Sequence, residues 1–401
     1  MNDRIRMQDI SRREMLRRMG IGVGALSTTA LLAACGVSGQ ADKPTPSGSD
    51  GGGLAGQDPA GQLDFANWPL YIDRAQGRRP TLEDFTKETG IEVSYKEVID
   101  DNESFFGTIR EPLANGQSSG WDIIVMTDWM IAKMNRLGYL EELDHDLLGN
   151  FAANAGEIYK NPTYDANNAH SIPWQSGITG IGYNPKLTGR EITSMNDLFD
   201  PAFKGKVGMF TEMRDSMSFA LLKNGIHPQD ATPEDVDAAA AALLKQRDDG
   251  IVRDYYGNSY ADALLREDLW ITMAWSGDVF QLQLDKPDLK FVVPDEGAIL
   301  WVDNMAIPKG AEHPVDAHMF MDYVYQPEVA AQITAWVNYI CPVPAARDIL
   351  ASSDDKFTQT VAESPLVFTT PDMESKLYHY KDLDEDEEQT WNDLFNQVIQ
   401  G

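Results

Sequence analysis

Short apolar runs alternate with amphipathic stretches from about residue 63 onward, and this alternation constrains the fold more than any other feature of the chain. Residues 63–66 predict a strand, 81–89 a helix that Gly90 ends, and 91–95 a second strand. The largely apolar run at 121–125 is typical of a strand buried on both faces. Strands and helices in this order predict an α/β fold with a mostly parallel sheet and helices on both of its faces.

The same pattern returns in the second half of the chain. Further strands are expected at 178–183, 206–210, 271–275 and 300–307, with helices at 233–246 and 315–325. The patterned region spans about 340 residues, which is more than one hydrophobic core normally holds. Two domains are therefore expected.

The amino-terminal segment has the composition of an export signal. Arg12 and Arg13 precede an uncharged stretch at 19–34, which ends in Leu-Ala-Ala-Cys at Cys35. Paired arginines indicate the twin-arginine route, and the closing tetrapeptide resembles a lipobox, in which Cys35 would carry the lipid. A single membrane-spanning helix is the alternative, although such a helix needs about 20 apolar residues. We expect residues 1–35 to be a twin-arginine lipoprotein signal.

The next segment and the overall charge restrict the partners. Residues 36–62 are rich in Gly, Ser, Pro and Asp, which predicts a flexible tether to the membrane. The net charge of −30 disfavours nucleic acid and favours small cations. The acidity is equally compatible with a solvated surface in a salty habitat. Cys341 would be left as a lone thiol, so no internal disulfide is expected.

The sequence carries no recognisable catalytic or metal-binding motif. It has no HExxH or CxxC spacing, no G-x-S-x-G elbow and no phosphate-binding P-loop. His313 and His318 are five residues apart and do not share one helix face. We expect no catalytic residues, no metal and no cofactor. The acidic run at 384–388 is interpreted as a solvated face.

Aromatic and acidic side chains recur where predicted strands end. They cluster at 67–71, 127–129, 211–215 and 275–278. In the strand segment 301–303, the Trp and the Asp are two residues apart and project from one face. Ligands of open α/β sheets bind beyond the carboxyl ends of the strands, so these clusters mark the expected site.

A pocket with aromatic walls and carboxylates at its ends suits an elongated organic cation. Aromatic faces attract an ammonium by about 0.5–2 kcal/mol per contact. A buried ammonium also needs a carboxylate, because an uncompensated charge costs several kcal/mol. The alternative for each Trp is ordinary packing in the core.

Several segments resemble the spermidine/putrescine-binding proteins of bacterial ABC importers. The similar segments are 63–71, 85–91, 121–125, 171–173, 181–184, 203–205 and 296–308. The resemblance covers about residues 63–345, and 301–308 is its most specific part. It implies a type II periplasmic-binding-protein-like fold of two lobes, each a mixed sheet flanked by helices, joined by hinge strands. The expected lobes are 63–177 plus 303–345 and 178–302 plus 346–401.

The resemblance also implies a set of binding residues. The candidate ligand-binding residues are Trp68, Tyr71, Thr127, Asp128, Trp129, Glu212, Asp215, Trp275, Trp301, Asp303 and Tyr339. Asp303 and Asp215 would take one amine with the Thr127 hydroxyl nearby, and Glu212 an inner or second amine. Trp129 replaces a usual tyrosine, Asp128 adds a carboxylate, and Lys381 falls where the family uses an amide.

These inferences predict a monomeric, lipid-anchored receptor on the outer face of the cell membrane or in the periplasm. It would capture polyamines by lobe closure and deliver them to an ABC permease without performing chemistry. One alternative is the same fold binding an amino acid, an opine or a sugar. An exported enzyme and a structural lipoprotein are further alternatives.

Overall fold

The computed structural model describes residues 53–400. The predicted signal at 1–35, the lipidation of Cys35 and the tether up to residue 52 lie outside the described residues. Within 53–400, none of the helices combines the length and apolar character that crossing a bilayer requires. Cys341 is buried and carries a free thiol.

Strands run through both halves of the chain. They are β1 (Gln62–Asn67), β2 (Glu92–Glu97), β3 (Ile123–Thr127), β4 (Ser171–Tyr183), β5 (Val207–Phe210), β6 (Val252–Tyr256), β7 (Ile271–Trp275), β8 (Lys290–Val292), β9 (Ala298–Ala306) and β10 (Leu377–Tyr378).

Helices connect and cover the strands. They are α2 (Pro80–Thr89), α3 (Asn102–Ala114), α4 (Asp128–Arg136), α5 (Gly149–Asn154), α6 (Pro185–Thr188), α7 (Met213–Lys223), α8 (Pro233–Asp248), α9 (Tyr260–Leu265), α10 (Ser276–Leu282), α11 (Pro314–Tyr323), α12 (Pro327–Val337), α13 (Ala346–Ala351), α14 (Lys356–Glu363), α15 (Pro371–Glu374) and α16 (Glu385–Ile399).

The strands form one mixed sheet with the order β2-β1-β3-β9-β4-β7-β5-β6, in which β10 pairs with β9 and β8 with β4. The outer pairs β1–β2, β1–β3, β5–β6 and β5–β7 are parallel, as the βα alternation predicts. At the centre, β9 is antiparallel to β3 and β4, and β4 is antiparallel to β7. The central strands are thus antiparallel between parallel outer strands, which makes the sheet mixed, as the resemblance implied.

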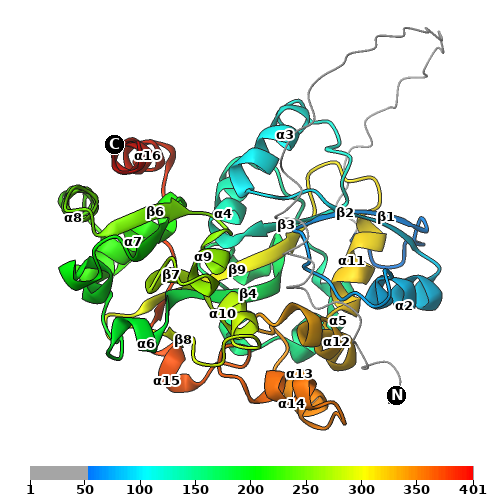
Figure 1. Ribbon diagram of the computed structural model, residues 1–401. Coiled ribbons are helices and arrows are strands. Elements are labelled where there is room, and N and C mark those ends of the chain that lie inside the picture. The colour runs from blue at the N-terminus through cyan, green and yellow to red at the C-terminus, as the bar shows by residue number, and fades with distance from the viewer. Residues whose placement is uncertain (1–52, 401) are drawn as a thin grey trace, which may run out of the picture.

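Helices and outer strands lie in two groups on either side of these central strands (Figure 1), and each group has its own hydrophobic core. Phe65 and Phe320 belong to the first core, and Phe210 and Tyr260 to the second. A third, smaller cluster packs α3 and α4 against β3 on the first side. The chain therefore forms two packed units that share one sheet.

Strands β4 and β9 cross from one unit to the other. Ile172 at the start of β4 lies in the first core, and Ile181 near its end lies in the second. Strand β9 does the reverse, with Ile299 in the second core and Met305 in the first. All residues of both strands are buried, so these strands hold the two units together.

The carboxyl-terminal segment requires a correction. We expected residues 346–401 to join the second lobe. Leu350 on α13 and Val361 on α14 are instead buried in the first core, whereas Leu383 and Trp391 are buried in the second. The chain therefore crosses from the first core to the second a third time, through β10 and the residues after it. The apolar residues before β10 pack in the first core, and those after it pack in the second.

Two smaller expectations also change. The tether does not extend to residue 62, because the backbone N–H groups of Ala60, Gly61 and Gln62 donate to the Asp316 carboxylate at 2.8, 2.7 and 3.1 Å. The acidic run is not entirely a solvated face, since Glu388 is only 9% exposed. Asp384 in the same run caps α16 and accepts from the backbone N–H of Glu387.

Candidate functional site

Asp303 lies on β9, between the neighbouring strands β3 and β4. Its carboxylate accepts hydrogen bonds from Tyr71 Oη and Thr127 Oγ1, each at 2.8 Å. Thr127 is the last residue of β3 and is the register partner of Asp303. Burial raises the pKa of Asp303 to about 7, although the two hydroxyl donors lower it. The group is therefore a buried carboxyl that an approaching cation would ionise.

Asn102 fixes the direction of the Thr127 hydroxyl. The Asn102 side-chain amide donates to Thr127 Oγ1 at 2.9 Å and accepts from the Thr127 backbone N–H at 3.1 Å. Because Oγ1 accepts from Asn102, its own proton goes to Asp303. Asn102 begins α3 and was not among the predicted site residues; a lone Asn at a helix start gave no sequence signal.

Aromatic rings pack edge to face beside Asp303. The Tyr339 ring lies 5.3 Å from the Trp301 ring and 6.0 Å from the Tyr71 ring. Two glycines leave room for them: a Cβ at Gly177 would lie 2.3 Å from Trp301, and one at Gly277 would lie 2.7 Å from Tyr339. Three predicted aromatic residues are thus brought together.

Tyr339 connects this group to a carboxylate that the site prediction missed. Tyr339 Oη and Tyr260 Oη donate to the two oxygens of Asp278, each at 3.0 Å. The Trp275 ring packs 4.7 Å from Phe210 and 5.7 Å from Tyr260. Asp278 follows β7 and belongs to the strand-end cluster at 275–278 that the sequence marked, although it was not among the candidate ligand-binding residues.

Asp215 and Glu212 lie at the start of α7 in the second lobe. Asp215 is 2% exposed and accepts from Tyr380 Oη at 2.8 Å. Burial and, next, the charge of Glu212 raise the pKa of Asp215 to about 7. Burial also raises the pKa of Glu212, against the effect of the nearby Arg214. Tyr380 was missed because its segment lacks the βα pattern.

Asp128 begins α4 and is buried. Its oxygens accept backbone N–H bonds from Trp129 at 2.7 Å and from Val302 at 3.2 Å. Its charge raises the pKa of both Asp303 and Asp215. Asp128 is therefore held by backbone N–H groups, and its charge favours the protonated forms of Asp303 and Asp215.

The two remaining tryptophans have specific contacts. Trp68 is half-buried, and its indole N–H donates to the Val125 carbonyl at 3.0 Å. One face of Trp129 is covered by the Arg214 guanidinium, 4.3 Å from the ring centroid. Lys381 donates to the Ala231 carbonyl at 2.8 Å. Trp129 thus already holds a cation from the chain itself.

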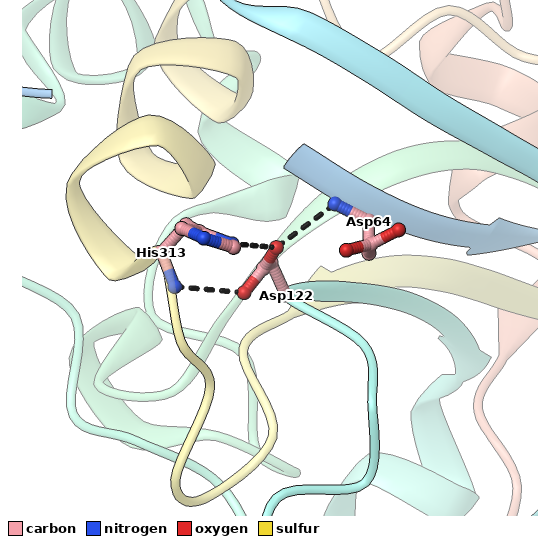
Figure 2. Close-up of side chains that lie close together, drawn as sticks. All are labelled: Asp64, Asp122 and His313. Carbon is pink, nitrogen blue, oxygen red and sulfur yellow. Dashed lines mark hydrogen bonds and ion pairs between the residues drawn. The ribbon is translucent and has the colours of Figure 1, made fainter. Parts of the chain in front are cut away.

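A separate cluster on the first lobe contains Asp64, Asp122 and His313 (Figure 2). Asp122 accepts from the backbone N–H of Asp64 and of His313, each at 2.8 Å, and lies 2.9 Å from His313 Nδ1. The Asp122 side chain raises the pKa of His313 despite partial burial. Asp122, directly before β3, therefore connects β1 through the Asp64 backbone N–H and the start of α11 through its ion pair with His313.

Comparison with known proteins agrees with this architecture. The sequence profile of the bacterial extracellular solute-binding proteins matches residues 81–369. A spermidine/putrescine-binding periplasmic protein of Haemophilus influenzae is 30% identical over 302 residues, 75% of this chain and 80% of its own. The Escherichia coli protein of the same description is 29% identical over 305 residues, 75% of this chain and 84% of its own.

Solved structures show the same architecture. The spermidine/putrescine ABC transporter substrate-binding protein PotD of Streptococcus pneumoniae has a TM-score of 0.72 and 26% identity, and the match covers 84% of this chain and 98% of that one. This similarity confirms the predicted two-lobed α/β fold. Because the profile covers most of the folded region, the chain belongs to the family of bacterial extracellular solute-binding proteins.

Proposed function

We propose that this protein captures a polyamine between its lobes and delivers it to an ABC permease. One observation carries the proposal: Asp303 on a crossing strand and Asp215 in the second lobe are both buried carboxyls whose pKa is raised to about 7. A buried carboxyl loses hydration without gaining a charged partner, and an ammonium group would supply that partner.

The surrounding groups favour a slender cation with two or more amines. The Asp278 carboxylate accepts from Tyr339 Oη, and Glu212 and Asp128 add negative charge near Asp215. The faces of Trp301 and Tyr339 suit the polarised methylenes between amines. The relatives named above are described as binding spermidine and putrescine, which agrees with this chemistry.

We propose that the ligand contacts are those predicted from the sequence, with Asp278 and Tyr380 added. The first lobe would comprise residues 63–177 and 303–345 together with α13 and α14, and the second would comprise 178–302 together with α16. Closure of the lobes about β4 and β9 would bury the ligand. The protein would bind its ligand without transforming it and would act as a monomer.

We further propose that residues 1–35 direct export by the twin-arginine route and that Cys35 carries a lipid. Two or more acyl chains give stable membrane attachment, so the protein would remain on the outer face of the cell membrane. Radiolabelled palmitate incorporation that is lost in Cys35→Ala would support the anchor. Equal labelling of both proteins would contradict it.

A thermal-shift panel tests the proposed ligand class. Putrescine, cadaverine, spermidine and spermine are compared with glutamate, an opine and glucose, each at the same concentration. A ligand at about 100 times its Kd stabilises the folded state by about 2.7 kcal/mol, so binding raises the Tm by several degrees. A shift with polyamines alone supports the proposal. A shift with the acidic or neutral solutes alone would show that the protein binds another class of solute.

A further inference from the structure

One face of α4 in the first lobe lies against the carboxyl-terminal segment of the second. Trp129, Lys133 and Arg136 are spaced i, i+4 and i+7, so they form one stripe along the helix. Arg136 Nη2 donates to the Leu383 carbonyl at 2.8 Å, and Arg136 is also paired with Asp382. The stripe therefore faces the residues that lead into α16.

One buried carboxylate, that of Glu388, contacts both lobes at this stripe. Glu388 Oε1 accepts from Arg214 Nη2 at 3.1 Å, within the second lobe. Glu388 Oε2 lies 3.4 Å from Lys133 Nζ, across the interface. The Arg214 guanidinium also lies over Trp129 of the first lobe, 4.3 Å from its centroid. Arg214 is 3% exposed and Glu388 9%, so these contacts are shielded from solvent.

The same arginine adjoins the proposed ligand contacts. Arg214 is in the first turn of α7, between Glu212 and Asp215. It also donates to the Lys381 carbonyl at 3.3 Å, next to Tyr380. A movement of α7 against α4 therefore changes the contacts of Arg214 with Trp129 and the surroundings of Asp215 together.

We propose that Arg214 and Glu388 are positioning residues which, with Lys133 and Trp129, form an ion-paired latch that holds the lobes closed and slows ligand release. We call these four residues the latch. The inference rests on the proposed function for its effect on ligand release, whereas its effect on lobe closure is independent of the ligand. The acidic run at 384–388 thereby gains a role in closure.

The physical basis is the shielding of these charges. Partly buried pairs are screened less by salt than exposed ones. Opening the lobes exposes the Trp129 face and separates Lys133 from Glu388. Truncating one partner of such a pair changes the dissociation rate more than the association rate. Ligand release should therefore respond to the latch, and ligand capture should not.

Lys133→Met in the full chain tests the latch without disturbing the buried Arg214–Glu388 pair. Stopped-flow measurement with putrescine and spermidine should show dissociation about fivefold faster and association unchanged. Lys133→Arg, which keeps the charge, should restore the slow rate. X-ray scattering of the ligand-free protein should show a more extended population for Lys133→Met.

Two control variants separate the latch from general charge effects. Glu103→Gln removes the other partner of Lys133, 2.7 Å away in the first lobe. Lys245→Met removes an exposed pair with Asp249 on α8. Both should leave dissociation within about twofold of the wild type. Glu388→Gln combined with Lys133→Met should be less than additive, because the two share one contact.

Dissociation from Lys133→Met within twofold of the wild type would overturn the latch, whatever the scattering shows. If the wild-type protein binds neither polyamine, the proposed function fails. The latch is then decided by scattering alone, and identical curves for the wild type and Lys133→Met would reject it.

Discussion

Asp303 and Asp215 are two candidate carboxyls that look alike but differ in their surroundings. Asp303 and Asp215 are both buried, and both have a pKa raised to about 7. Asp303 is fixed on a strand by two neutral hydroxyls, those of Tyr71 and Thr127. Asp215 lies in the first turn of a helix and accepts from the Tyr380 hydroxyl, and the Thr179 hydroxyl also lowers its pKa.

The difference lies in what else can carry charge nearby. At the Asp215 end, Glu212 offers a second carboxylate, while Arg214 and the amino-terminal end of α7 favour anions. At the Asp303 end, the neighbouring Asp128 already uses both oxygens for backbone N–H groups. An amine bound beside Asp303 therefore depends on one carboxylate, whereas an amine bound beside Asp215 has Glu212 as a second carboxylate.

Asp303→Asn should have the largest effect. It removes the carboxylate that would pair with the amine there and leaves a buried ammonium without a counter-charge. A broken buried pair costs about 3–5 kcal/mol, so calorimetry should show polyamine affinity reduced by at least about a hundredfold. Asp288→Asn, an exposed acid paired with Lys186, serves as the matched control and should bind like the wild type. Affinity within twofold in Asp303→Asn would contradict this account of the site.

Lowering the pH should weaken binding next most strongly. An ammonium favours the ionised carboxyls, so binding releases protons and affinity rises about tenfold per pH unit for each carboxyl below its pKa. The two raised pKa values of about 7 place this change between about pH 5.5 and 8. Calorimetry near pH 6.5 in buffers of different ionisation enthalpy should report between one and two protons released. No proton release would argue against both groups as ligand contacts.

The same pKa values predict that the folding stability of the ligand-free protein falls as the pH rises, whereas ligand affinity rises. Each folded-state pKa is raised above the ordinary value of 3.8, so the ionised form is disfavoured by folding. The stability contribution of these groups is therefore complete below about pH 4 and is lost as the pH rises through about 7. Denaturant unfolding of Asp215→Asn, compared with the wild type, should show a smaller loss over this range.

Asp215→Asn should weaken binding less than Asp303→Asn, by about tenfold. Glu212 remains close enough to receive the amine, and removing Asp215 relieves the repulsion between the two acids. Calorimetry on Glu212→Gln, Asp215→Asn and the double variant gives the coupling between them. A double variant no weaker than Asp215→Asn alone would show that Glu212 is not a substitute.

Removing one hydroxyl should have the smallest effect. A hydrogen bond to a charged group contributes about 1.5–3 kcal/mol, part of which solvent or ligand replaces. Tyr71→Phe should weaken binding about fivefold, with Thr127 still in place. Tyr380→Phe should weaken it less, because α7 still favours the charge of Asp215. A larger loss of affinity in Tyr380→Phe than in Tyr71→Phe would contradict the difference argued between Asp215 and Asp303.

Much of the fold could be predicted from the sequence. The strand at 271–275 was predicted with the bounds that the structure shows, because its apolar run is sharply bounded. The central antiparallel pairing could not be predicted, since β4 and β9 are buried throughout and carry no alternation. The division of residues 346–400 between two cores also depends on tertiary packing that no local pattern records.

The site was predicted in part. Trp301 and Asp303 were found because two residues apart on a strand share a face, and the structure places Tyr71 and Tyr339 against them. Tyr380 and Asn102 act through their position in space, so spacing along the chain could not reveal them. Arg214 over Trp129 was also missed, because that contact joins two helices of different lobes.

The central claim is that two buried carboxyls, Asp303 on a crossing strand and Asp215 at the start of α7, select a slender cation. Calorimetric titration of putrescine and spermidine into the wild-type protein and into the Asp303→Asn/Asp215→Asn double variant tests it most directly. We expect one-site binding with proton release in the wild type and no measurable heat in the double variant. Equal affinity in the two proteins, or no polyamine binding by the wild type, would contradict the claim.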